Sequence, residues 1–151
     1  MRAIRKLDMP MDCIEEQFRR MAFNIIGRNQ DDHVKNIAFL MDRSGTWSLS
    51  PAFDMTYSYN PSGAWTSAHQ MSLNGKRDNF ELEDFTACSK NASMKRGRAE
   101  EILLQVQNAV LKWMDFAKQA GVPDDVANRI AKAHRTNILG YSTVFASAVA
   151  T

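Results

Sequence analysis

Three polar residues, Asp31, Asn36 and Asp54, have types and a spacing that could support phosphoryl transfer. In this reaction the protein mainly positions the reactants and neutralises charge. It needs a carboxylate beside the acceptor hydroxyl and oxygen ligands for magnesium beside the phosphates. In enzymes of this chemistry, one loop supplies the carboxylate and an asparagine as Asp-x-x-x-x-Asn, and a second metal-binding aspartate follows a short hairpin. Asp31 and Asn36 have that separation, and Asp54 lies just beyond a predicted hairpin.

Each of these residues also has an ordinary structural interpretation. Asp-x-x-x-x-Asn alone occurs by chance in many proteins, so Asp31 is also explained as a turn or cap carboxylate, Asn36 as a turn amide and Asp54 as an Asx turn. Asp32 offers a second carboxylate, but only Asp31 stands five residues before Asn36. The helix before the loop, the hairpin after it and the aspartate at the hairpin exit together favour the catalytic interpretation.

An amphipathic helix is expected immediately before this loop. Asp12 and Glu15 have the spacing of a capping box, which predicts that the helix begins near Asp12. Apolar residues then recur at steps of four, three and four and form one face: Ile14, Phe18, Met21 and Ile25. The helix is expected to end around Gly27, because the polar run NQDDH has too little apolar content to continue it.

A small hairpin is expected after the loop, over roughly Ile37 to Ser50. IAFLM and WSLS are typical of short strands, and DRSGT between them is typical of a turn. The next stretch, PAFDMTYSYNPSG, is irregular and rich in Pro, Gly, Asn and aromatic residues, which predicts an ordered loop. MSLNGK is a candidate for one more short strand.

The remainder of the chain reads as helical. EDFTACSK predicts one helix, and a long helix ending at Gly121 follows it. One stripe of that long helix is apolar: Leu103, Val106, Val110, Trp113 and Ala117. Trp113 is expected to be buried against Phe18 and Met21. A last helix from Pro123 to about Leu139 should face inward through three residues: Val126, Ile130 and Ala133. The predicted fold is mainly α (α+β), with one small antiparallel hairpin.

Composition places the chain among ordinary globular proteins. It has 151 residues, 44% hydrophobic and 24% charged, with a net charge of +2, which indicates one domain and gives no direct nucleic-acid signal. No secretory signal or membrane-spanning run is visible, so a cytoplasmic location is expected. The basic stretch Lys95–Arg98 is either a solvated helix entrance or a phosphate contact. Cys13 and Cys88 are expected to be small buried groups rather than a disulfide.

The stretch RNQDDHVKNIAFLMDRSGTWSLSPAFDMTYS, with MSLNGK after it, strongly resembles the catalytic and metal-binding segments of HipA-like toxin kinases. The resemblance runs from about Phe18 to Leu139, and DDHVKN and PAFD are its most specific parts. It implies that residues 1–151 are the C-terminal lobe of a serine/threonine protein kinase, a helical lobe of the protein-kinase-like fold. It also implies an enzyme that uses ATP and Mg²⁺.

The same resemblance implies roles for individual residues. Asp31 would be the general base, and Asn36 and Asp54 the magnesium ligands. His33 would donate to Asp31 or to a transferring phosphate oxygen, although a loop histidine bonded to a backbone carbonyl explains it equally well. Lys35 would neutralise phosphate charge, unless it is simply an exposed surface lysine.

Partners are implied in the same way: a DNA-binding antitoxin, and a protein substrate such as an aminoacyl-tRNA synthetase. The sequence departs from the family in having no glycine-rich phosphate-binding stretch and no room for an N-terminal lobe before the first helix. We therefore expect a missing N-lobe segment or a partner chain to complete the site, and the chain alone to be inactive. Asp54 is not followed by Phe-Gly, which favours the HipA-like group over ordinary protein kinases. Two alternatives remain: a non-catalytic kinase remnant that binds proteins, and a small-molecule or lipid kinase.

Overall fold

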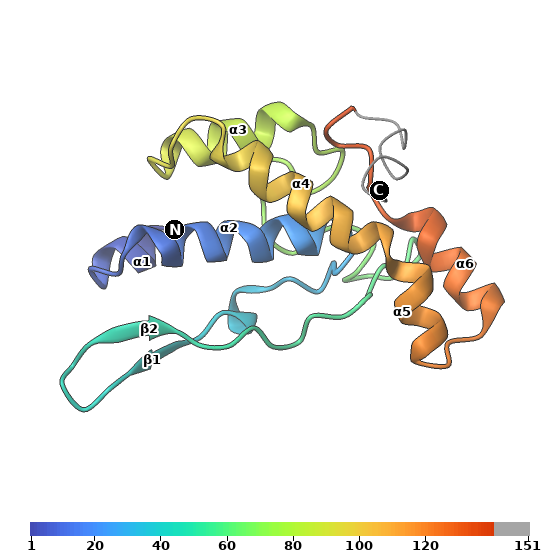
Figure 1. The fold of residues 1–151 in the computed structure, drawn as a ribbon, viewed down its shortest axis with the longest axis horizontal. Helices are drawn as coiled ribbons and strands as arrows, with labels where there is room; N and C mark the ends of the chain where they lie inside the picture. Colours follow the sequence, from blue (N-terminus) through green and yellow to red (C-terminus); the bar gives the residue numbers. More distant parts are fainter. Residues whose placement is uncertain (141–151) are drawn as a thin grey trace, which may run out of the picture.

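The computed structural model describes residues 1–140, which form a mainly helical domain with one two-stranded antiparallel sheet (Figure 1). This confirms the predicted balance of helix and strand. In chain order the elements are α1 (Arg2–Lys6), α2 (Met11–Ile26), the 3₁₀ turn η1 (Val34–Asn36), β1 (Phe39–Met41), β2 (Trp47–Leu49), α3 (Leu82–Asn91), α4 (Arg98–Leu111), α5 (Trp113–Gln119) and α6 (Asp124–Ala133).

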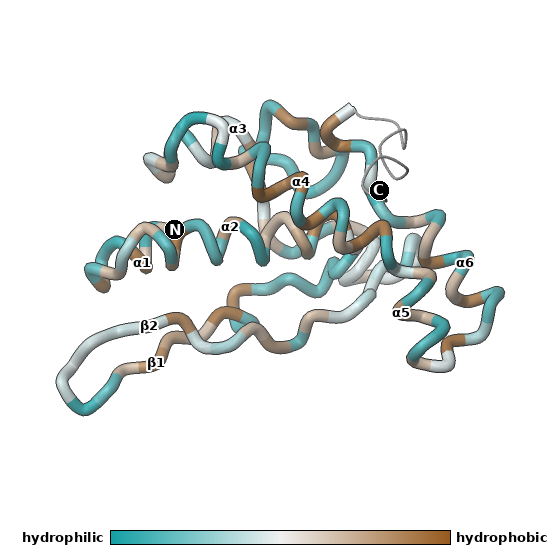
Figure 2. Tube along the Cα trace, viewed as in Figure 1, coloured by the Kyte–Doolittle hydropathy of each residue, from teal (hydrophilic) through white to brown (hydrophobic). Residues whose placement is uncertain are grey.

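The core lies between α2, α3 and α4, which pack together (Figure 1). Hydrophilic and hydrophobic residues alternate along α4 (Figure 2), as expected of a helix with one face on a core. Phe18 of α2 meets Phe85 of α3 edge to face, with ring centroids 6.3 Å apart, and both side chains are fully buried. Burial of each such side chain is worth about 1.5–3 kcal/mol, so this contact holds α2 firmly where its C-terminal end must position the loop that follows.

The start of the chain differs from the prediction in two respects. A short helix, α1, precedes α2, and α2 begins at Met11 after an extended Pro10 rather than at a capping Asp12. Asp12 therefore falls inside the first turn, where its charge still favours the helix N-terminus. Glu15 forms an ion pair with Arg98 at 2.9 Å instead of completing a capping box.

The predicted hairpin is confirmed, with Leu40 of β1 opposite Ser48 of β2, and it lies below α1 and α2 in the view of Figure 1. MSLNGK, however, is not a strand. It forms a tight turn with a single β-bridge between Leu73 and Lys76, because Asn74 and Gly75 both adopt left-handed backbone conformations that a strand does not contain.

A true capping box occurs at α3 instead, between Glu81 and Asp84. Asp84 is buried, which by itself raises the pKa of its carboxyl. Hydrogen bonds from the Asn74 side chain, the Glu81 backbone N–H and the Lys76 ammonium outweigh this effect, so the pKa of Asp84 lies below its ordinary value.

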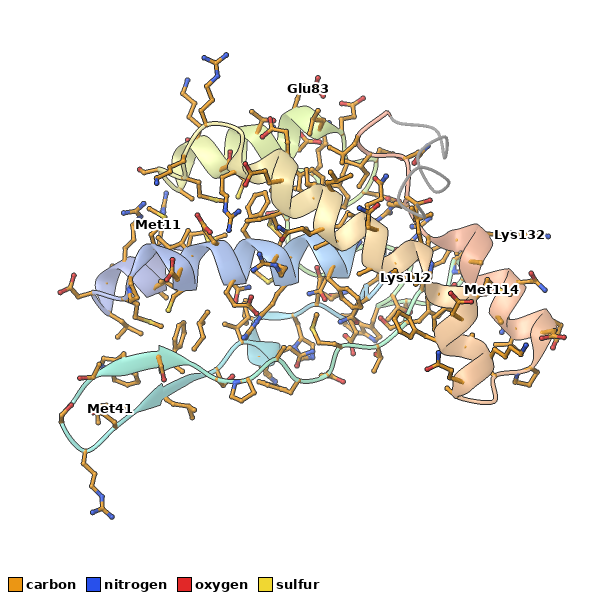
Figure 3. The ribbon with its side chains drawn as sticks, in the orientation of Figure 1. Met11, Met41, Glu83, Lys112, Met114 and Lys132 are labelled. Carbon is orange, nitrogen blue, oxygen red and sulfur yellow. The ribbon has the colours of Figure 1, made fainter. Side chains whose placement is uncertain are left out.

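The predicted long helix is wrong because it breaks at Lys112, where α4 ends and α5 begins (Figure 3). Trp113 is only part-buried and lies outside the core that contains Phe18, so its predicted packing is wrong as well. Its indole Nε1 donates to the Ala127 carbonyl at 2.9 Å, and its ring meets His134 edge to face at 5.8 Å. Trp113 thus joins α5 to α6 rather than α4 to α2.

The last helix is shorter than predicted, since α6 ends at Ala133, although Ile138 and Leu139 still pack against the core.

Both cysteines are free and partly buried. Gly97, in a left-handed conformation inside the basic stretch, is the N-cap of α4, which begins at Arg98. None of the helices in the described part of the chain combines the length and the apolar character that a membrane crossing requires.

Candidate functional site

The site is built where the chain leaves α2 and turns back beneath it. Arg28 adopts a left-handed backbone conformation (φ 61°), which directs the chain out of the helix after Gly27. Its side chain is held at several points: Nε donates to the Ala133 carbonyl at 2.8 Å, Nη1 donates to Gln30 at 2.8 Å, and the guanidinium lies 4.1 Å from the Tyr59 ring centroid. The loop of residues 29–36 therefore starts from a rigid point.

Asn36 and Asp54 lie in direct contact although they come from opposite sides of the hairpin. Asn36 Nδ2 donates to Asp54 Oδ2 at 2.7 Å and to the Asp31 carbonyl at 3.1 Å. Both amide hydrogens are thus engaged within the loop, while Asn36 Oδ1 has no hydrogen-bond partner among residues 1–140. Asp54 has a left-handed backbone (φ 54°), a conformation that aspartate tolerates better than most residues.

A second layer of hydrogen bonds joins the backbones of Asp31 and Asp54. The Asp31 N–H donates to Ser58 Oγ at 3.0 Å, and the Ser58 hydroxyl donates to Asn29 Oδ1 at 3.1 Å. Asn29 Nδ2 in turn donates to the Asp54 carbonyl and to Asn24 Oδ1, both at 3.1 Å. Asn29 is only 3% exposed, so these bonds are shielded from water and hold the two acidic residues in a fixed relation.

The other three residues predicted for the site differ in their exposure and in their contacts. The Asp31 side chain is 47% exposed, and its Oδ1 lies 4.0 Å from His33 Nε2, which is longer than a hydrogen bond. His33 Nδ1 is buried and has no partner within the described residues. Lys35 is exposed and forms no hydrogen bond or ion pair within residues 1–140, as expected of a surface lysine.

Asp32, the competing carboxylate, is fully engaged inside the protein. Its Oδ2 lies 2.9 Å from His69 Nδ1, and its Oδ1 accepts the backbone N–H groups of Gln70 at 2.7 Å and Met71 at 3.3 Å. Of the two adjacent aspartates, Asp31 is therefore the one whose carboxylate is open to a reactant.

A cavity of about 840 Å³ borders the site, within the size range typical of ligand pockets. Its wall includes Asn29, His33, Asn36 and Asp54 on one side, and residues of α1, α2 and the 71–74 turn on the other. Asp32 also borders the cavity, whereas Asp31 and Lys35 do not.

The donor set suits a hard cation that brings other ligands with it. Asn36 Oδ1 and the Asp54 carboxylate are oxygen donors on one side of the cavity, whereas no group of three or more His, Cys, Asp or Glu side chains in the described chain could hold a metal alone. Magnesium is typically bound through one or two protein oxygens together with water and substrate phosphates. The residues present fit that mode of binding.

Several residues of this arrangement were not predicted from the sequence: Asn29, Ser58, His69 and Arg135. Asn29 lies within the motif RNQDDH, but its partners are up to 29 residues away and no spacing rule identifies them. His69 has no neighbouring signal at all.

Fold and site together define a helical domain with an oxygen-rich pair of loops at the end of its central helix. A family model described as HipA-like C-terminal domain matches residues 1–137, and the chain belongs to this family. Searches of curated proteins and of solved structures produced no significant match.

Proposed function

We propose that this chain is the catalytic lobe of a HipA-like kinase that transfers the γ-phosphate of ATP to a serine or threonine hydroxyl of a protein. The observation that carries the proposal is the 2.7 Å contact between Asn36 and Asp54, because two residues that bind one magnesium ion must lie side by side. Membership of the HipA-like family supports the same chemistry.

Asn36 and Asp54 would hold the magnesium ion, which when bound neutralises charge on the phosphates. Asp31 would accept the proton of the acceptor hydroxyl, and its open carboxylate leaves room for that group. His33 borders the cavity beside Asp31, where its imidazole would donate to Asp31 or to a phosphate oxygen. Lys35 is exposed and would contribute only if phosphate charge extends to the surface.

The proposal includes partners. A phosphate-clamping segment from an N-lobe or another chain would complete the site, since the sequence contains no glycine-rich stretch for that task. By family relation, a DNA-binding antitoxin and a translation enzyme such as an aminoacyl-tRNA synthetase are the proposed antagonist and substrate.

A second candidate function is a non-catalytic kinase remnant that binds proteins. It is favoured by exposed apolar side chains on the hairpin and at the cavity: Leu40 (52% exposed) and Met41 (59%) lie on β1, and Phe53 (43%) borders the cavity. Met55 and Tyr57, which follow Phe53 in the same loop, are partly buried.

Metal binding separates the two candidates. Mn²⁺, which replaces Mg²⁺ and is detectable by its effect on water-proton relaxation, should bind the wild-type chain and bind Asp54→Asn at least about tenfold more weakly. Asp42→Asn, which changes an exposed carboxylate at the hairpin turn, is the matched control and should bind as the wild type does. Equal Mn²⁺ affinity in Asp54→Asn and Asp42→Asn would refute the catalytic proposal and favour the binding module.

A further inference from the structure

Asp32, next to the proposed base, is the centre of a buried polar network that the proposed function leaves unexplained. Its side chain is 8% exposed, and its carboxylate accepts three hydrogen bonds from the segment of residues 69–71. A buried carboxylate is unfavourable unless it is well paired, and this one is paired entirely with groups distant in sequence.

The partners of His69 determine its protonation state. His69 is 0% exposed, and its Nε2 lies 2.9 Å from Arg135 Nη1. A guanidinium nitrogen can only donate, so Nε2 must accept. The ring is therefore neutral, and Nδ1 carries the proton that it donates to Asp32 at 2.9 Å.

Arg135 connects this pair to the end of the central helix. Its backbone N–H donates to the Ile26 carbonyl at 2.9 Å, its Nη1 also donates to the Ile25 carbonyl at 3.3 Å, and its Nη2 pairs with Asp78. Phe80 packs edge to face on the His69 ring at 5.3 Å and keeps water from it. One chain of contacts thus runs from the loop of residues 29–36 to the chain segment after α6.

We infer that Asp32 is a positioning residue: its bond to neutral His69, backed by Arg135, fixes the loop of residues 29–36, so that the Asp31 carboxylate stays exposed and Asn36 stays beside Asp54. The inference rests on the proposed function. The Asp31 carboxylate makes no hydrogen bond within residues 1–140, so only its backbone is held in place by the surrounding structure. The backbone is held on one side by Ser58 and on the other by Asp32.

The first test uses the wild-type chain. Nitrogen-15 spectra of the imidazole groups distinguish the two neutral tautomers from the imidazolium. We expect His69 as the Nδ1–H tautomer at neutral pH, with its proton resonance far downfield. The Nε2–H tautomer or an imidazolium would overturn the inference.

The second test is Asp32→Asn, which keeps the side-chain volume but replaces one of the two accepting oxygens with a donating NH₂ group. The amide NH₂ must face either His69 Nδ1–H or the backbone N–H groups of residues 70 and 71, and each arrangement opposes two donors. Asn36, a proposed metal ligand, lies in the same loop and bonds to the Asp31 carbonyl, so we expect Mn²⁺ affinity to fall about tenfold, the loss typical of groups that orient metal ligands. We also expect the Asp31 amide hydrogen to exchange about tenfold faster than in the exposed control Asp12→Asn, because loop opening sets its exchange rate.

Phe85→Leu separates an effect on loop position from an effect on stability, because Phe85 is a buried residue of α3 that packs on Phe18 in the core. A purely structural role for Asp32 would leave the Mn²⁺ affinity of the folded protein unchanged in both Asp32→Asn and Phe85→Leu, and would overturn the inference. If Asp32→Asn does not fold, Arg135→Met, which removes the donor to Nε2 together with the contacts to the Ile25 carbonyl and to Asp78, must release the Nδ1–H tautomer and accelerate Asp31 exchange. If the wild type binds no Mn²⁺, the proposed function fails, while the tautomer and the Asp31 exchange rate still decide the role of Asp32.

Discussion

Asn29 should be the most important uncharged side chain of the site, and replacing it with alanine should destabilise the protein substantially. Its amide makes three hydrogen bonds of 3.1 Å, to Asn24, to the Asp54 carbonyl and from the Ser58 hydroxyl, in a position only 3% exposed. A net worth of about 0.5–1.5 kcal/mol for each bond predicts a loss of about 2–4 kcal/mol in the free energy of unfolding.

A double-mutant cycle with Ser58 isolates the shared part of this network. Ser58→Ala removes the hydroxyl that accepts from the Asp31 N–H and donates to Asn29, so it should cost about 1–3 kcal/mol. Because one hydrogen bond belongs to both side chains, the double variant should lose about 0.5–1.5 kcal/mol less than the two single losses combined.

Urea denaturation followed by tryptophan fluorescence gives the free energy of unfolding of the wild type, the two single variants and the double variant. The comparison is valid when the slope of this free energy against urea concentration is the same in all four proteins. Asn128→Ala is the control, because Asn128 is exposed and bonds only to the Asp124 carbonyl within α6. It should change stability by less than about 0.5 kcal/mol. A loss for Asn29→Ala as small as that of the control would refute the reasoning that this amide holds the two loops together.

Three further predictions concern activity, pH dependence and packing. The isolated chain, incubated with Mg²⁺, labelled ATP and a kinase substrate, should transfer no more phosphate than its Asp31→Ala variant, because half of the positioning groups are missing; clear excess transfer would show a self-sufficient enzyme. Since folding lowers the pKa of Asp84, its stabilising contribution is present above the ordinary value of 3.8 and is lost as pH falls below it. Acid unfolding of Asp84→Asn should therefore be less steep than that of the wild type, whereas the exposed variant Asp115→Asn should run parallel to the wild type. Trp113→Ala, at a part-buried site, should cost about 1.5–3 kcal/mol in chemical denaturation, less than the about 3–5 kcal/mol expected for Phe85→Ala in the core; equal losses would contradict the observed burial.

Elements defined by short-range patterns were predicted well. The apolar face of α2, the turn of the β1–β2 hairpin and the helix α3 each depend on residues close together in the chain. The predicted pairing of Asn36 with Asp54 belongs to the same class, because a hairpin returns the chain to its starting point and brings its two flanks together.

The errors arose where a regular spacing of residues continues across a helix boundary and therefore does not reveal it. The stripe from Leu103 to Ala117 continues in phase through Lys112, yet the helix ends there and Trp113 packs on α6. Asp12 and Glu15 have the spacing of a capping box, but the N-cap is the extended Pro10 and the helix begins at Met11. Tertiary packing decides such points, because the free-energy differences between local alternatives are small.

The sequence by itself determined the order of the elements, the oxygen-rich composition of the two loops and the likeness to HipA-like proteins. Only the tertiary structure decided which of two adjacent aspartates faces outward and which is buried. Asp32 is turned inward by His69, 37 residues away, and His69 is held by Arg135, a further 66 residues along the chain. Such pairs leave no periodic trace in a sequence, because they form only where packed helices and turns exclude water around them.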